Sequence, residues 1–156
     1  MRIFACAVAL ILVGCGSSPV GAGAKTEAQP VPAAPVRDHT SMLPINNRTG
    51  AKVVADHMLD QPKFPGGTLG DYKAGGKEFQ MFIIDTADNQ AAAFLLLDAK
   101  SIMQNPEYIS YMGGYFGIDG KRPLYVFSRL HYLAGVAGLP KDEADPIARV
   151  LASRLR

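Results

Sequence analysis

The sequence predicts an α+β fold with a mainly antiparallel sheet and helices packed on one face of that sheet. Short β-type runs are joined by hairpin signals, of which Gly75-Gly76 and Asp119-Gly120 are the clearest. Residues 91–97 and 142–155 have the apolar spacing of helices instead. Strands that follow one another through tight turns, with only two helices among them, favour antiparallel pairing.

The composition of the chain argues against several classes of protein. The chain has 156 residues, a formal net charge of +2 and two cysteines. So small a charge does not predict a nucleic-acid-binding surface. Two cysteines exclude a disulfide-dense scaffold and a four-cysteine metal site.

The domain is expected to begin at residue 45, and its first element is predicted as a helix over residues 51–59. Helical spacing places Ala51, Val54 and Met58 on one face. Prolines at positions 62 and 65 would end this helix, and Gly66-Gly67 would open a turn.

A hairpin follows, with arms at residues 69–74 and 77–85. The second arm carries apolar side chains on both faces, which predicts a strand in the interior of the sheet. Thr86 can cap a helix through residues 91–97, and Pro106 would end any extension of it.

The second half of the domain is predicted to be hairpins and a final helix. Residues 115–118 and 124–127 flank the Asp119-Gly120 turn, and residues 128–131 form a second turn before a strand at 132–137. The helix spans residues 142–155. Pro146 is tolerated only near the first turn of a helix, so a start at Asp145 is the alternative.

The first 14 residues have the pattern of an export signal. Arg2 supplies a positive charge and residues 3–13 are an uninterrupted apolar run. The run is shorter than the roughly 20 residues that a membrane-spanning helix needs. We therefore interpret residues 1–14 as a signal peptide.

The end of this segment, Leu12-Val13-Gly14-Cys15, resembles the lipobox of bacterial lipoproteins. The resemblance implies that the Cys15 sulfur receives a diacylglycerol, that the chain is cut before Cys15, and that the new amine is acylated, palmitate being an expected acyl group. Two or three acyl chains hold a protein stably at a bilayer. In that family, an aspartate directly after the cysteine retains the protein in the inner membrane. The residue here is Gly16, so the resemblance implies attachment to the outer membrane, facing the periplasm, if the organism has one.

Residues 15–44 are predicted to be a lipidated, disordered tether. Residues 16–44 contain five prolines and no aromatic residue. Such a segment buries too little apolar surface to offset the entropy of ordering it. His39 is expected to be solvated there, and residues 45–156 to form the small α+β domain.

A cluster of aromatic residues in the second half is the candidate contact surface. Tyrosines combine stacking area with a polar tip, and nearby glycines allow close approach. The alternative is that these side chains simply belong to the core of the sheet. The candidate binding residues are Tyr108, Tyr111, Tyr115, Phe116, Tyr125 and Tyr132.

Two other arrangements of residues are weaker indications of function, one for metal binding and one for catalysis. Asp56, His57 and Asp60 have the spacing of a metal half-site on a helix, although a polar helix face explains them as well. Ser128 and His131 suggest a triad with an aspartate, but no Gly-x-Ser-x-Gly motif surrounds Ser128. We therefore expect no metal, no cofactor and no catalytic residue.

Together these patterns predict a lipid-anchored cell-envelope protein that acts by non-covalent interaction with an envelope protein or ligand. The alternative is a small periplasmic hydrolase or other enzyme that uses His131 or His57 with nearby carboxylates. A mainly structural domain is a third possibility.

Overall fold

The computed structural model describes residues 35–156. The predicted signal peptide, Cys15 and the tether up to residue 34 lie outside this range. The elements are β1 (Arg48–Asp56), the 3-10 turn η1 (Met58–Asp60), β2 (Pro65–Ala74), β3 (Lys77–Asp85), α1 (Asn89–Ile102), β4 (Gln104–Ile109), β5 (Gly114–Asp119), β6 (Arg122–Arg129), β7 (Tyr132–Ala137) and α2 (Lys141–Arg154).

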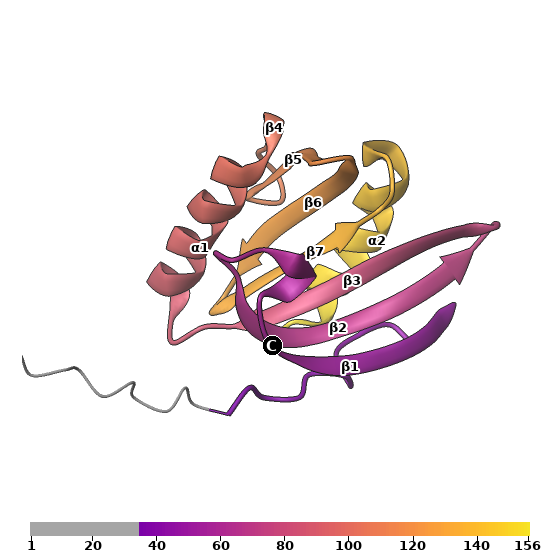
Figure 1. Ribbon diagram of the computed structural model, residues 1–156, viewed down its shortest axis with the longest axis horizontal. Coiled ribbons are helices and arrows are strands. Elements are labelled where there is room, and N and C mark those ends of the chain that lie inside the picture. Colours follow the sequence, from indigo (N-terminus) through magenta and orange to yellow (C-terminus); the bar gives the residue numbers. More distant parts are fainter. Residues whose placement is uncertain (1–34) are drawn as a thin grey trace, which may run out of the picture. The chain divides into compact units, whose positions relative to one another are not determined.

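All seven strands belong to one antiparallel sheet with the order β1-β2-β3-β7-β6-β5-β4. It consists of two meanders, β1 to β3 and β4 to β7, which β3 and β7 join by pairing with each other. Figure 1 shows β1 at one edge and β4 at the other. The α+β class and the antiparallel sheet are therefore confirmed.

The two helices cover opposite faces of the sheet, so the prediction that they share one face is wrong. Leu95 of α1 packs in a cluster with Leu124 and Val126 of β6. Leu151 of α2 packs in a second cluster with Tyr125, the β6 residue between those two. Successive residues of a strand point to opposite faces, and the interior strands are apolar on both, so each face needs its own cover.

The predicted helix at residues 51–59 is a strand instead. Residues 48–56 form β1, which pairs with β2 from Arg48↔Tyr72 to Asp56↔Pro65. As an edge strand, β1 is half-buried at most, so its sequence lacks a clear period of two. Gly66-Gly67 lies within β2 and not in the predicted turn. Glycine is needed at position 66 because a Cβ there would meet the Ala55 carbonyl oxygen at 2.2 Å.

Residues 37–44 pack against the domain, so the predictions of a tether up to residue 44 and of a solvated His39 are wrong for this stretch. The Leu43 side chain is 1% exposed. Tyr72 donates a hydrogen bond to the Pro44 carbonyl at 2.7 Å. The His39 backbone N–H donates to Thr68 Oγ1 at 2.9 Å. Sequence periodicity cannot detect a segment that packs through one apolar side chain and isolated hydrogen bonds.

The cap of α1 is not the predicted Thr86, whereas α2 agrees with the predicted helix over residues 142–155 to within one residue at each end, so a start at Asp145 is wrong. The N-cap of α1 is Asp88, whose Oδ1 accepts the Ala91 N–H at 2.8 Å. The second helix begins at Lys141 and contains Pro146. Strand β4, which includes Pro106, was not predicted. Neither helix in residues 35–156 is long and apolar enough to cross a membrane.

We predict that Gly135→Ala destabilises the fold, because a Cβ there would lie 2.3 Å from the Tyr125 carbonyl oxygen and 2.8 Å from the Phe82 ring. Overpacking of this kind lowers the free energy of unfolding by about 2 kcal/mol, measurable by urea denaturation. Gly50→Ala is the control, since its nearest atom would be Asp71 Oδ2 at 3.8 Å. Equal stability of the two variants would contradict the packing described for β7.

Candidate functional site: a polar hollow on the β2–β3 hairpin

Polar side chains lie on the half of the β2–β3 hairpin nearest its turn. They are on the same face of the sheet as α1. Asp71 lies opposite Gln80, whose Nε2 donates to Asp71 Oδ1 at 2.8 Å. Lys73 lies opposite Glu78, and Lys73 Nζ donates to Glu78 Oε1 at 3.1 Å. These side chains share one face because the two pairs are two residues apart along each strand.

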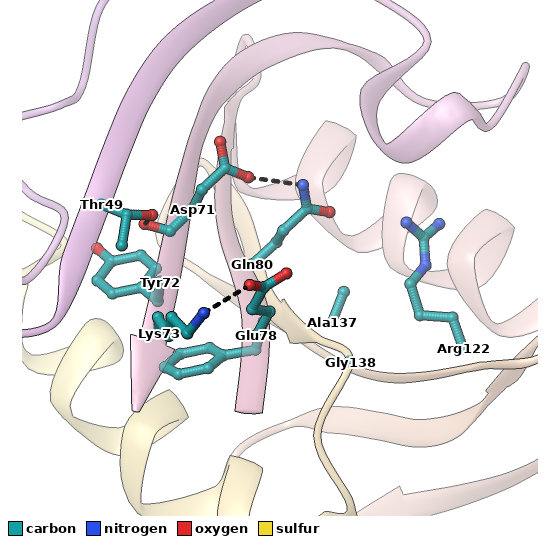
Figure 2. A pocket seen from close by; sticks show the side chains of 10 residues that line it. Thr49, Asp71, Tyr72, Lys73, Glu78, Gln80, Arg122, Ala137 and Gly138 are labelled. Carbon is teal, nitrogen blue, oxygen red and sulfur yellow. Dashed lines mark hydrogen bonds and ion pairs between the residues drawn. The ribbon is translucent and has the colours of Figure 1, made fainter. Parts of the chain in front are cut away.

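This polar part of the sheet is left uncovered. Helix α1 contacts β5, β6 and β7 on this face, and the segment between β1 and β2 covers the next part with Met58, Leu59 and Phe64, all buried. Beyond that segment lies a hollow of about 580 Å³ (Figure 2). We call it the polar hollow; its lining is Thr49, Asp71, Tyr72, Lys73, Glu78, Phe79, Gln80, Arg122, Ala137 and Gly138.

Arg122 lies across the hollow from Asp71 and Gln80 (Figure 2). Its Nη2 donates to the Leu59 carbonyl at 2.8 Å and to Asp119 Oδ2 at 3.0 Å. Asp119 also accepts Gln61 Nε2, at 2.8 Å from both carboxylate oxygens. Arg122 therefore ties the covering segment to the β5–β6 turn and bounds the hollow on that side.

The hollow carries groups that can form hydrogen bonds and ion pairs. Two carboxylates, two cationic groups, an amide and the Thr49 hydroxyl offer donors and acceptors with a balanced charge. The arrangement suits a polar partner with both donors and acceptors.

The predicted aromatic contact residues do not form one surface. Tyr125 is fully buried and Tyr132 is 4% exposed, so both belong to the core. Tyr108 and Tyr115 lie side by side, with ring centroids 5.3 Å apart, on the α1 face. Phe116 packs against Tyr125 on the α2 face. Alternation along the strands separates the set, and none of its members lines the polar hollow.

Tyr111 has a structural role at the start of α2. Its hydroxyl and that of Tyr125 both donate to Asp145 Oδ1, at 2.5 and 2.7 Å. Arg149 Nε donates to Asp145 Oδ2 at 2.9 Å, and its guanidinium lies 4.6 Å from the centroid of the Tyr111 ring. We call these four residues the Asp145 cluster; it joins α2 to the turn after β4.

Burial acts against the charge of Asp145, but the hydrogen bonds from Tyr111 and Tyr125 and the charge of Arg149 outweigh it and lower the pKa of Asp145. Burial is also the largest effect on Tyr125, and with the hydrogen bond to Asp145 it raises the pKa of this tyrosine. The cluster therefore holds Asp145 as a carboxylate beside a neutral Tyr125, and the Asp145 charge is paired with Arg149.

The two histidines considered for metal binding or catalysis, His57 and His131, lie at different places in the fold: His57 follows β1, and His131 lies in the turn between β6 and β7. His57 Nδ1 lies 3.1 Å from Asp56 Oδ2, and both side chains are more than half exposed. No group of three or more candidate ligands among residues 35–156 is arranged to hold a metal ion. Asp60 does not share a helical face with His57, because this region is a strand and a single 3-10 turn.

His131 does meet a carboxylate, Asp85. Asp85 Oδ1 lies 3.6 Å from His131 Nε2, and Asp85 Oδ2 lies 3.0 Å from His39 Nε2 and 3.4 Å from Arg37 Nη1. No hydrogen bond joins Ser128 to His131 within the described chain. The structure does not form the Ser128–His131 arrangement considered above, and Asp85 holds residues 37–39 against the ends of β3 and β7.

Sequence reasoning missed the polar hollow and the Asp85 contacts. A signal for the hollow was available in the hairpin itself, since Asp71, Lys73, Glu78 and Gln80 alternate with buried residues on both arms. The Asp85 contacts join residues more than 40 positions apart, so no local pattern could have indicated them.

We predict that Asp145→Asn lowers the free energy of unfolding at pH 7 by about 2 kcal/mol, the typical cost of losing charged hydrogen bonds. The pKa of Asp145 is lowered in the folded state, so its stabilisation is present above an unfolded pKa of about 4 and is lost as the pH falls through the folded value. Urea denaturation at pH 7 and pH 3 should therefore show a smaller acid-induced loss in the variant.

The control is Asp98→Asn, because the Asp98 side chain is half exposed and its Oδ1 lies 3.7 Å from Lys63 Nζ. An exposed pair contributes little, so this variant should retain the pH dependence of the parent. If both variants behave alike, the cluster does not stabilise the fold as described.

Comparison of the chain with protein-family models, curated proteins and solved structures found no match. The function of this chain is therefore inferred from the residues that line the polar hollow and from the N-terminal sequence.

Proposed function

We propose that this chain is a lipid-anchored protein of the bacterial cell envelope that acts by non-covalent binding. The observation that carries the proposal is the short apolar run that ends in Leu12-Val13-Gly14-Cys15. An apolar run of this length after a single positive charge is typical of an export signal. The cysteine stands at the position where lipoproteins receive their diacylglycerol.

Acylation at Cys15 would account for membrane attachment without a spanning helix. Two or three acyl chains bury enough methylene groups to make attachment stable, whereas one chain gives only marginal binding. By the resemblance to lipoproteins, Gly16 after the cysteine favours the outer membrane as the destination, with the domain in the periplasm, if the organism has an outer membrane. Residues 16–34 would then connect the anchor to the folded domain.

The polar hollow is the part of the domain that we propose contacts the partner. It lies on the β2–β3 hairpin, and its polar groups are positioned by direct cross-strand pairs. A partner with donors and acceptors can exchange hydrogen bonds with Asp71, Gln80 and the Lys73–Glu78 pair without a conformational change. We propose an envelope protein or a small polar envelope ligand in this position.

We predict that Cys15→Ser moves the protein from the membrane fraction to the soluble fraction and abolishes labelling with a palmitate analogue. The membrane-bound fraction should fall at least about tenfold, because the acyl chains supply the binding free energy. Cys6→Ser is the matched control, since Cys6 lies within the predicted signal peptide and should leave both readouts unchanged. Unchanged fractionation and labelling of Cys15→Ser would refute the anchor.

A second experiment tests the hollow. A photo-crosslinking residue, Lys73→p-benzoylphenylalanine, should capture a partner in intact cells, because Lys73 projects from the rim of the hollow. The same residue at Gln90, an exposed position on α1, is the control and should capture nothing comparable. Equal adducts at both positions would indicate that the hollow is not the contact surface.

A further inference from the structure

Strand β1 has an open outer edge. Within residues 35–156 it pairs with β2 alone, and no backbone hydrogen bond joins residues 50–55 to any other segment. An edge of this kind presents a row of unpaired N–H and C=O groups to which another strand can add. Figure 1 shows β1 as the outermost strand on its side of the sheet.

The opposite edge is protected in ways that β1 is not. Strand β4 contains Pro106, which lacks an N–H, and Asn105 with φ of 49°. Its pairing with β5 is also irregular between Gln104 and Glu107. In β1 the only irregularity lies at its start, between Arg48 and Gly50, so residues 51–56 are regular. The difference leaves β1 as the edge that is able to pair.

The side chains of β1 suit burial by a neighbour. Ala51, Val53 and Ala55 project from one face and are exposed, Val53 at 44%. Lys52, Val54 and Asp56 share the other face. Lys52 makes no ion pair within the described residues, and the Asp56 carboxylate contacts only the neighbouring His57.

We propose that β1 pairs antiparallel with β1 of a second copy of this chain, about a two-fold axis through Val54. The two sheets then form one continuous sheet, as in an isologous dimer. Lys52 lies opposite Asp56 of the partner subunit, and Asp56 opposite the partner's Lys52. On the other face, Val53 lies opposite the partner's Ala55.

The charges select this register. Residues directly opposite each other in an antiparallel pair share a face, so the register must keep faces matched. A two-fold axis at Lys52 would place two lysines opposite each other, which is repulsive. An axis at Val53 would leave Lys52 opposite Val54 of the partner subunit, with neither charge paired. Only the axis at Val54 pairs both lysines with both aspartates.

Crosslinking of the full chain in detergent tests the pairing. Val54→Cys places two thiols across the axis, about 5 Å apart between Cβ atoms, so a short bismaleimide should give a covalent dimer. Gln104→Cys, on the other edge strand, is the matched control and should give at least about tenfold less dimer, as should the parent chain with its own Cys6 and Cys15. Equal yields from positions 54 and 104 would overturn the proposal.

Charge exchange tests the register and separates it from damage to the fold. In the Val54→Cys background, Lys52→Asp turns two attractive pairs into two repulsive ones and should lower the dimer yield about tenfold. Lys52→Ala should give an intermediate yield. Adding Asp56→Lys to Lys52→Asp should restore the dimer. A yield that Lys52→Asp leaves unchanged, or that a folded double variant fails to recover, would refute the register.

Discussion

The antiparallel pairing of β3 with β7 is the contact on which the rest of the structure depends. It joins two meanders that are separated in the chain by α1. The joined strands become interior strands, and their side chains are buried on both faces: Phe82 and Ile83, neighbours in β3, are both fully buried. A sheet with an apolar interior on both faces needs two covers, and the two helices supply one each.

Each cover is smaller than the sheet. Helix α1 lies over β5 to β7, and the segment with Met58 and Phe64 lies over the middle of the adjoining strands. On the α1 face the far half of the β2–β3 hairpin remains uncovered, and β1 keeps an open outer edge. Both proposed interaction sites, the polar hollow and the β1 edge, lie in this uncovered part, while the polar groups near the helices are satisfied internally.

Prediction from sequence succeeded where a feature is local. The strand at 77–85 and the hairpin at Asp119-Gly120 depend on alternation and turn chemistry, which neighbouring residues carry. It failed for β1, because an edge strand with one neighbour has little alternation to detect. It also failed to separate the tyrosines, since Tyr125 is buried in the interior strand β6 and Tyr111 is exposed in the turn after β4.

The sequence by itself determined the class of the fold, the order of most of its elements and the signal-like N-terminus with Cys15, because each of these depends on residues close together in the chain. Only the tertiary structure decided which face each helix covers, where residues 37–44 lie and which polar side chains remain open. Those outcomes depend on pairings such as β3 with β7 and His39 with Asp85, between residues 46 or more positions apart. No local sequence pattern indicates such long-range pairings, because they depend on which strands become the interior strands of the sheet.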